Sequence, residues 1–461
     1  MTERGRRREG GRAGAGAASN ISLRMKRVVI VILDGLRRDL VTETLTPSLA
    51  AFRTRAEEFR AHRSVFPSAT RVVSASVATG CHPARHGLQG NSVALLEDGV
   101  FVRHDAGGPD FLQHKRRVTG TSLSVPTMTE RVEHHGGAIT FSNASPGAAY
   151  AQDPDGHGFL YNRAGSFEPG RAPVAPADEL RVTGDLAGDR AMTERFVGEV
   201  LLERRPALAV LWLHEPDHMQ HALPLGSPAH RETVRQADAH AGVVIAAVDR
   251  LRAAGDDVLF VVGSDHGHQS VTGVIDVDAE LVAAGLKESR ASSDVVPVSS
   301  GTSTLIYVHP DHRARIPAVH DFLSSCGWAG GVFAPERLSE VGQAPVGGLA
   351  FAVSMRAEDR PNEFGVPGLS LEALPLAGKS EHLGFGQHGG LATYEQSPFL
   401  MIAGPGFQPG AAARGPTSVV DIAPTALRHL DLPVAGMDGH PLQRAGGRAS
   451  DEFPPADATR T

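Results

Sequence analysis

The sequence has little cysteine, few aromatic residues and no long apolar run. The 461-residue chain contains two cysteines, Cys81 and Cys326, and neither belongs to a CxxC pair. Two cysteines cannot build a disulfide framework, so a reduced state is the simpler expectation. No stretch approaches the ~18–20 apolar residues that a membrane-spanning helix needs. These absences exclude a disulfide-stapled scaffold and an integral helical membrane protein, and they lead us to expect no membrane partner.

A strong positive charge is also lacking. Lys and Arg number 45 against 52 Asp and Glu, a net charge of −7. This balance argues against non-specific binding of nucleic acid or of an anionic membrane surface. Small anionic substrates remain compatible with it, because a bound metal supplies its own positive charge.

The two ends of the chain have the composition of disordered tails. Residues 1–24 begin with basic residues but contain no apolar core of the kind that a signal peptide needs. We expect residues 1–24 to form a disordered basic tail, residues 446–461 a second disordered tail, and residues 25–445 a catalytic domain. With no export signal in view, the expected location is the cytoplasm.

Three short apolar runs predict strands that are buried on both faces. They comprise residues 28–33, 208–213 and 258–262. Each run is followed within a few residues by acids: Asp34, then Glu215 and Asp217, then Asp265. Ligands of open α/β sheets bind beyond the carboxyl ends of the strands. The three strands therefore predict one site assembled from distant segments.

Helical patterns fill the intervals between these strands. Residues 231–254 carry one apolar stripe, and residues 71–78 form a short helix that Gly80 would end. This alternation predicts a doubly wound α/β/α sandwich, to which the runs at residues 304–308 and 399–403 would add strands. Segments 95–190 and 270–385 do not fit the rhythm and are interpreted as insertions that shape the pocket.

Acids and histidines occur at spacings that suit metal binding. Asp217 and His221 lie four residues apart on one helical face, and Asp265-His266 directly follows a strand. Asp34 and His388 complete the set. Each piece alone has a plainer interpretation, such as a helix cap for Asp34 or an exposed pair for the others. A mixed Asp and His environment favours zinc, with manganese or iron as alternatives.

Taken together, these motifs resemble the nucleotide pyrophosphatase/phosphodiesterase (type I phosphodiesterase) family of the alkaline phosphatase superfamily. The matching segments are VVIVILDGLRRD, FPSATRVVSASVATGCHPARHGLQGN, LHEPDHMQH, GSDHG, HGG and SVVDIAPTALRHLDLPVAGMDGHPL. They extend over roughly residues 27–442. The resemblance implies a sandwich of alkaline phosphatase type with inserted cap segments, and a hydrolase that uses two metal ions.

The resemblance also implies a role for individual residues. One metal ion would be held by Asp34, Thr70, Asp265 and His266, and the other by Asp217, His221 and His388. Thr70 would be the nucleophile, and Asn91 would donate a hydrogen bond to a phosphoryl oxygen. General chemistry is consistent with these roles. A threonine hydroxyl must be activated, for example by a metal ion, before it can act as a nucleophile, and the N–H groups at the start of a helix attract phosphate. Thr70 as a helix cap and Asn91 as a turn residue are the plainer alternatives.

Arg71 departs from the family pattern. Nucleotide-specific members often carry an aromatic residue after the nucleophile, and only 5% of this chain is aromatic. An arginine there could instead bind a second anionic group of the substrate, such as a carboxylate or another phosphate. This possibility brings in the related phosphonoacetate hydrolases, which cleave a C–P bond. The alternative is an arginine that faces solvent.

The leading hypothesis is a dimetal hydrolase of phosphodiester or pyrophosphate bonds that acts through a phosphothreonine intermediate on a small phosphorylated substrate. The alternatives are a C–P hydrolase for a small phosphonate such as phosphonoacetate, and a phosphomonoesterase. An alternative from another class is a binding protein without catalytic activity. Inactive relatives usually lose metal ligands or the nucleophile, whereas all seven of these positions are retained here. Cys81-His-Pro-Ala-Arg85 resembles the sulfatase signature, yet it follows Thr79-Gly80 instead of standing at the nucleophile position.

Overall fold

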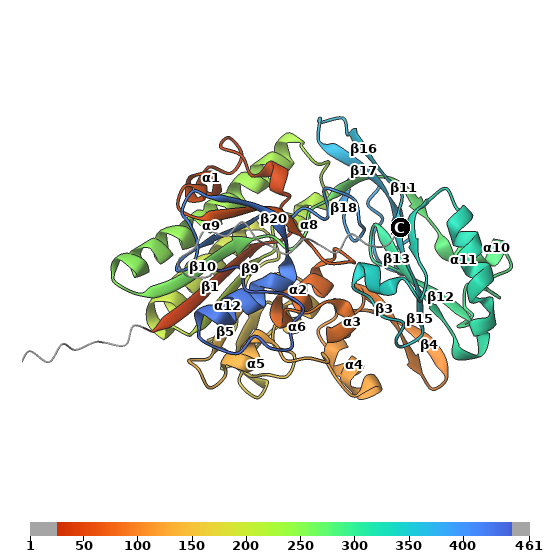
Figure 1. The fold of residues 1–461 in the computed structure, drawn as a ribbon, viewed down its shortest axis with the longest axis horizontal. Coiled ribbons are helices and arrows are strands. Elements are labelled where there is room, and N and C mark those ends of the chain that lie inside the picture. Colours follow the sequence, from red (N-terminus) through yellow and green to blue (C-terminus); the bar gives the residue numbers. More distant parts are fainter. Residues whose placement is uncertain (1–24, 445–461) are drawn as a thin grey trace, which may run out of the picture.

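A ten-stranded mixed sheet runs through the centre of the molecule in the computed structural model, which describes residues 25–444 (Figure 1). The two predicted tails lie outside the described residues. In spatial order the strands are β20 (Ala412–Ser418), β2 (Glu57–Arg63), β19 (Leu400–Ala403), β10 (Asp257–Gly263), β1 (Lys26–Leu33), β9 (Leu208–Leu213), β5 (Ala138–Ser142), β6 (Phe159–Asn162), β7 (Gly165–Glu168) and β8 (Ala172–Pro173).

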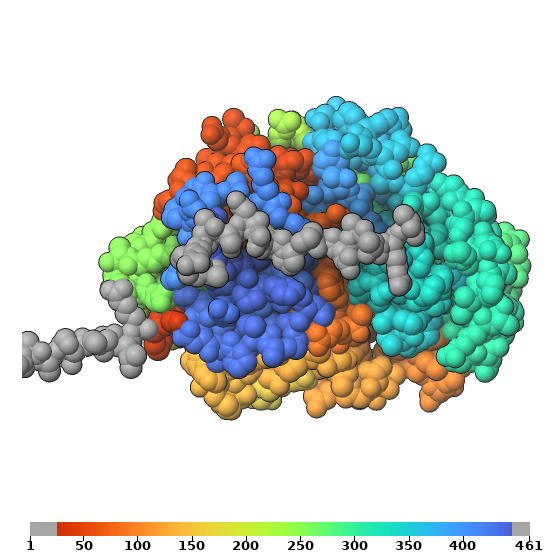
Figure 2. Space-filling model, viewed as in Figure 1, coloured from red at the N-terminus to blue at the C-terminus, as the bar shows by residue number. Residues whose placement is uncertain are grey.

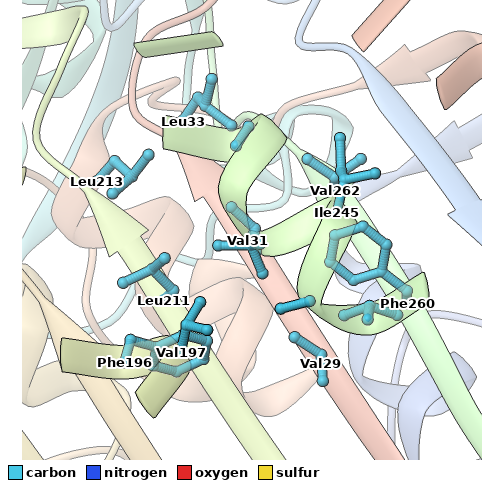
Figure 3. Packing of buried hydrophobic residues seen from close by; sticks show 14 of the residues in the cluster. Val29, Val31, Leu33, Phe196, Val197, Leu211, Leu213, Ile245, Phe260 and Val262 are labelled. Carbon is cyan, nitrogen blue, oxygen red and sulfur yellow. The ribbon is translucent and has the colours of Figure 1, made fainter. Parts of the chain in front are cut away.

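Strand β1 lies at the middle of this sheet, parallel to both β10 and β9. Its side chains alternate between two apolar layers. Val29, Val31 and Leu33 face one layer (Figure 3), and Val28, Ile30 and Ile32 face the other. This explains why the run is apolar at every position, since neither face meets water.

Helices cover both faces of the sheet. One layer contains α1 (Pro47–Arg53), α7 (Leu186–Arg195), the π-helical turn Phe196–Arg204 and the long α9 (Pro228–Ala253). The other contains α2 (Thr70–Thr79), α5 (Met128–Val132), α6 (Pro146–Ala151) and α12 (Ile422–His429). The predicted α/β/α sandwich is therefore confirmed.

The three apolar runs became β1, β9 and β10, and the predicted helices became α9 and α2. Gly80 ends α2 in the left-handed conformation, with φ of 66°. The run at 399–403 became β19 of the central sheet, as predicted. The run at 304–308 was assigned to the wrong sheet. It lies in β13 (Ser303–Val308), which is also buried on both faces but belongs to a separate sheet.

Residues 269–387 build two four-stranded sheets outside the central one. The first contains β16 (Ala357–Pro361), β17 (Pro367–Ala373), β11 (Gln269–Ile275) and β18 (Gly386–Gln387). The second contains β12 (Val295–Ser299), β13, β15 (Leu349–Met355) and β14 (Ala329–Phe333), with α10 (Val277–Ala283) and α11 (Ile316–Ser325) packed on it. Figure 2 shows this cap, in teal and cyan, at one end of the molecule.

The segment 95–190 differs from the predicted insertion. Its first part does lie outside the central sheet: the hairpin of β3 (Ser92–Glu97) and β4 (Val100–Asp105), followed by α4 (Phe111–Thr119). Strands β5 to β8, however, extend the central sheet. The sequence of β5, AITFS, mixes hydroxyl and apolar side chains, so it lacks the continuous apolar run that marked the other buried strands.

No helix among the described residues is both long enough and apolar enough to cross a bilayer. Both cysteines carry free thiols, with Cys81 buried and Cys326 partly buried.

The two-faced burial of the central sheet predicts where truncation is costly. Leu211 in β9 is fully buried, whereas Leu202, in the π-helical turn, is 47% exposed. Leu211→Ala should lower the free energy of unfolding by about 2–5 kcal/mol, because it leaves a cavity in the core. Leu202→Ala should change it by less than ~0.5 kcal/mol. Urea unfolding of both variants checks this, and equal losses would contradict the assigned layers.

Candidate metal centre

Three buried aspartates meet where the central parallel strands end. Asp34 directly follows β1, Asp217 opens the short helix α8 (Asp217–Gln220) beyond β9, and Asp265 follows β10. All three side chains are buried. The three carboxylates therefore lie at the carboxyl edge of the sheet, where the strand pattern placed them.

The first cluster contains Asp34, Asp265, His266 and Thr70. The Nε2 atom of His266 lies 3.1 Å from Asp265 Oδ2 and 3.5 Å from Asp34 Oδ1. It also lies 3.1 Å from the hydroxyl oxygen of Thr70. The four predicted ligands of one ion are thus gathered around a single imidazole nitrogen.

Each carboxylate of this cluster has one oxygen fixed by the protein. The indole N–H of Trp212 donates to Asp34 Oδ2 at 2.9 Å, and the Gly35 backbone N–H donates to Asp265 Oδ1 at 3.0 Å. The other oxygens, Asp34 Oδ1 and Asp265 Oδ2, are buried without a hydrogen-bond donor. Buried polar atoms normally have a hydrogen-bond donor or a metal ion as partner. Both of these oxygens lie within 3.5 Å of Nε2 of His266, so one ion could contact them together.

The second cluster contains Asp217, His221, His388 and a further residue, His268. Asp217 Oδ1 lies 3.5 Å from Nε2 of His388 and 2.8 Å from Nε2 of His268. Asp217 Oδ2 lies 3.6 Å from Nε2 of His221. The two clusters adjoin, because the rings of His266 and His388 stack with centroids 3.7 Å apart.

The other ring nitrogen of three histidines faces a backbone carbonyl. Nδ1 of His388 lies 2.8 Å from Ser68 O, that of His221 3.0 Å from Gly386 O, and that of His266 3.1 Å from Gly267 O. An Nδ1–H that donates to a carbonyl leaves Nε2 with its lone pair free. This is the arrangement that metal-ligating histidines adopt.

The charge in the two clusters calls for a cation. Burial, together with the carboxylates of Asp265 and Asp217, raises the pKa of Asp34 well above its ordinary value. Among the described residues, the ion-pair partners of these three aspartates are histidines, with no Lys or Arg. Burial also lowers the pKa of His388 well below its ordinary value, which keeps that ring neutral. Carboxylate oxygens and imidazole nitrogens together form a donor set that fits divalent metal ions.

Comparison with known proteins places these motifs in a family. The family model described as type I phosphodiesterase/nucleotide pyrophosphatase matches residues 28–325. The chain belongs to that family. Membership places it among the phosphodiesterase-type hydrolases, and it confirms the resemblance to the alkaline phosphatase superfamily. No curated protein matches the chain.

Solved structures share the fold of this family member. An inactive variant of murine ectonucleotide pyrophosphatase/phosphodiesterase 5, in complex with AMP, aligns with a TM-score of 0.64 and 16% identity, covering 90% of this chain and 97% of that one. The human protein of the same name aligns with a TM-score of 0.62, 16% identity and the same coverage. At this identity, the likeness concerns the fold.

Thr70 and Asn91 lie together at the start of α2. Ala69, and not Thr70, occupies the N-cap position of α2, and the Thr70 hydroxyl instead contacts Nε2 of His266. The side-chain oxygen of Asn91 accepts the backbone N–H of Arg71 at 3.1 Å. Because the oxygen accepts this bond, the Asn91 amide N–H groups remain as donors near the start of α2.

Arg71 extends along the protein instead of reaching freely into solvent. Its guanidinium packs on Gly107, where an added Cβ would come within 2.5 Å of Nη2. Burial by itself raises the pKa of Asp105, but the charges of Arg71 and Lys379 hold that pKa below its ordinary value. Lys379 forms an ion pair with Asp105 close to the start of α2. Arg71 acts on the same carboxylate only through its charge, and its buried Nε has no hydrogen-bond partner among the described residues.

The sequence patterns did not identify His268 or the two buried acids that hold the loops carrying the candidate ligands. The only local signal for His268 is its place two residues after His266, in the string DHGH. The buried Asp189 accepts the backbone N–H groups of His214 and Glu215, ahead of Asp217. The buried Glu395 accepts those of Gly390 and Ala392, after His388.

The Trp212 contact generates a prediction about metal affinity. Trp212→Phe keeps an aromatic ring but removes the donor to Asp34, so metal affinity should fall about 10–100-fold, as for other lost partners of metal ligands. Trp328→Phe is the matched control, because the Trp328 N–H lies in the cap and has no hydrogen-bond partner. Titration against a competing chelator measures both affinities. An unchanged affinity in Trp212→Phe would show that Asp34 needs no such support.

Proposed function

We propose that the chain hydrolyses phosphodiester or pyrophosphate bonds of a small phosphorylated substrate, with a covalent intermediate on Thr70. The observation that supports this most is the place of the Thr70 hydroxyl. It lies at the start of a helix and 3.1 Å from His266, at the edge of a cluster rich in unpaired carboxylate oxygens.

Two divalent ions are part of the proposal, with zinc favoured over manganese and iron. Asp34, Thr70, Asp265 and His266 would hold one ion, and Asp217, His221 and His388 the other. Such ions make a hydroxyl more acidic and stabilise the charge on the attacking and leaving oxygens of phosphoryl transfer.

In the proposed reaction, each residue has a separate role. The positive end of the α2 dipole attracts the phosphoryl oxygens, and the Asn91 amide donates to one of them. The Thr70 oxygen attacks phosphorus in line and its proton passes to solvent, while the leaving group departs with the bonding electron pair and takes up a proton from solvent. Water then attacks the phosphothreonine, which releases phosphate or a phosphomonoester and restores the hydroxyl.

A second candidate is hydrolysis of a small phosphonate that carries a carboxylate. It is supported by two basic side chains beside Asp105: Lys379 forms an ion pair with that carboxylate, and Arg71, next to Thr70 in the chain, has a buried Nε with no hydrogen-bond partner in the described part of the chain. A substrate carboxylate could replace that internal partner. The cytoplasmic location predicted from the sequence fits either small-molecule substrate.

The nucleophile assignment predicts a separation between turnover and metal binding. Thr70→Ala should abolish turnover of bis-p-nitrophenyl phosphate while metal content stays close to that of the unaltered protein. Thr70→Ser should keep part of the rate, because it retains a hydroxyl. Thr119→Ala, at the exposed end of α4, controls for the loss of a helical threonine. Near-normal turnover by Thr70→Ala would overturn the assignment.

The role of Arg71 predicts a change in substrate selectivity. Arg71→Ala should reduce kcat/KM by the equivalent of about 2–4 kcal/mol for substrates with a carboxylate or an extra phosphate near the reacting phosphorus. It should have little effect on bis-p-nitrophenyl phosphate, which has no such second group. Arg71→Lys should rescue little, since an ammonium cannot form the bidentate fork. Equal losses on phosphonoacetate, nucleoside diphosphates and the aryl diester would mean that Arg71 only supports α2.

A further inference from the structure

A second group of metal-ligating side chains lies outside the candidate metal centre. It consists of Glu97 at the end of β3, His104 in β4 and His114 in α4, here called the hairpin cluster. One ligand-type atom from each residue lies within 4.8 Å of the other two. Figure 1 shows β3 and β4 between α4 and the strands of the cap.

The two imidazoles of the hairpin cluster converge on one atom. Nε2 of His104 lies 2.5 Å, and Nε2 of His114 3.0 Å, from the same oxygen of Glu97, Oε1. The ring centroids are 4.7 Å apart. Side-chain exposures of 20–29% leave room for an ion to enter from solvent.

An ion pair accounts for only one of the two imidazoles. If both rings were protonated, two cations would face each other across one carboxylate oxygen and repel. If one ring were protonated, it would balance the charge of Glu97, and the second imidazole would add nothing to the charge balance. Two imidazoles and one carboxylate that converge from three separate elements are instead a donor set that zinc and related transition metals take, with water completing the shell.

We propose that Glu97, His104 and His114 form a binding site for a divalent transition-metal ion, of which zinc is the probe, separate from the candidate metal centre. The ion joins the hairpin to α4. Both ends of the hairpin lie against the start of α2, since Asn91 precedes β3 and Asp105 ends β4. A bound ion therefore stiffens the element that carries Asn91 and Asp105.

Zinc content of matched variants tests the site. Full-length protein is equilibrated with zinc, separated from free ion by gel filtration and measured by mass spectrometry. Glu97→Gln and His104→Gln keep hydrogen-bonding shape but lose a good zinc ligand, so each should bind one zinc ion fewer per chain than the unaltered protein. His134→Gln is the control, because His134 is exposed and lies outside the cluster.

The difference between variants, and not the total, decides the outcome. Failure of the proposed dimetal centre would lower the total in every sample but leave the difference of one. Equal zinc in the unaltered protein and in both Gln variants would overturn the hairpin site and leave an ordinary polar contact.

A measurement on the unaltered protein keeps the test decisive if the variants fold poorly. Diethyl pyrocarbonate modifies free imidazole nitrogens, and mass spectrometry locates the modified residues. Zinc should protect His104 and His114 at least several-fold relative to metal-free protein, while His134 reacts equally in both. Equal modification of His104 and His114 with and without zinc would overturn the proposal.

Discussion

Three carboxylates are buried at the point where three parallel strands end, with histidines instead of lysine or arginine as their ion-pair partners among the described residues. Burying a charged carboxylate costs several kcal/mol. At Asp34 this cost raises the pKa, because burial and the neighbouring carboxylates disfavour the charged form and favour a bound proton. Divalent ions would replace that proton, so binding of metal, release of protons and stability of the fold would be coupled at this edge of the sheet.

The surrounding structure keeps this unfavourable arrangement in place. The central strands fix the spacing of Asp34, Asp217 and Asp265, and buried acids fix the loops. Burial raises the pKa of both Asp189 and Glu395 to about 7, yet each still accepts backbone N–H groups from a loop that carries a candidate ligand. Other side chains near the start of α2 come from elsewhere: the cap supplies Lys379, the hairpin supplies Asp105, and Asn91 directly precedes the hairpin. The sheet therefore positions the candidate metal ligands, while segments outside it contribute the neighbouring polar groups.

The sequence predicted the parts of the site that local pattern controls. Continuous apolar runs identified β1, β9 and β10, and the acids after them marked the edge of the sheet. Local pattern reports burial but not the partner of a strand, which is why residues 304–308 were placed in the wrong sheet and residues 138–173 outside the central one. His268 was missed for a related reason. Its direction depends on the backbone at Gly267, where an added Cβ would lie 2.2 Å from the carbonyl oxygen of Tyr394, a contact with a distant segment.

Anomalous X-ray diffraction at the zinc edge, from crystals of zinc-equilibrated protein, tests the central claim most directly. The account predicts two strong peaks beyond the carboxyl ends of β1, β9 and β10. One should lie about 2.0–2.2 Å from oxygens of Asp34 and Asp265 and from Nε2 of His266, and the other at the same range from Asp217, His221 and His388. A single peak, or none, in this region would contradict a dimetal centre.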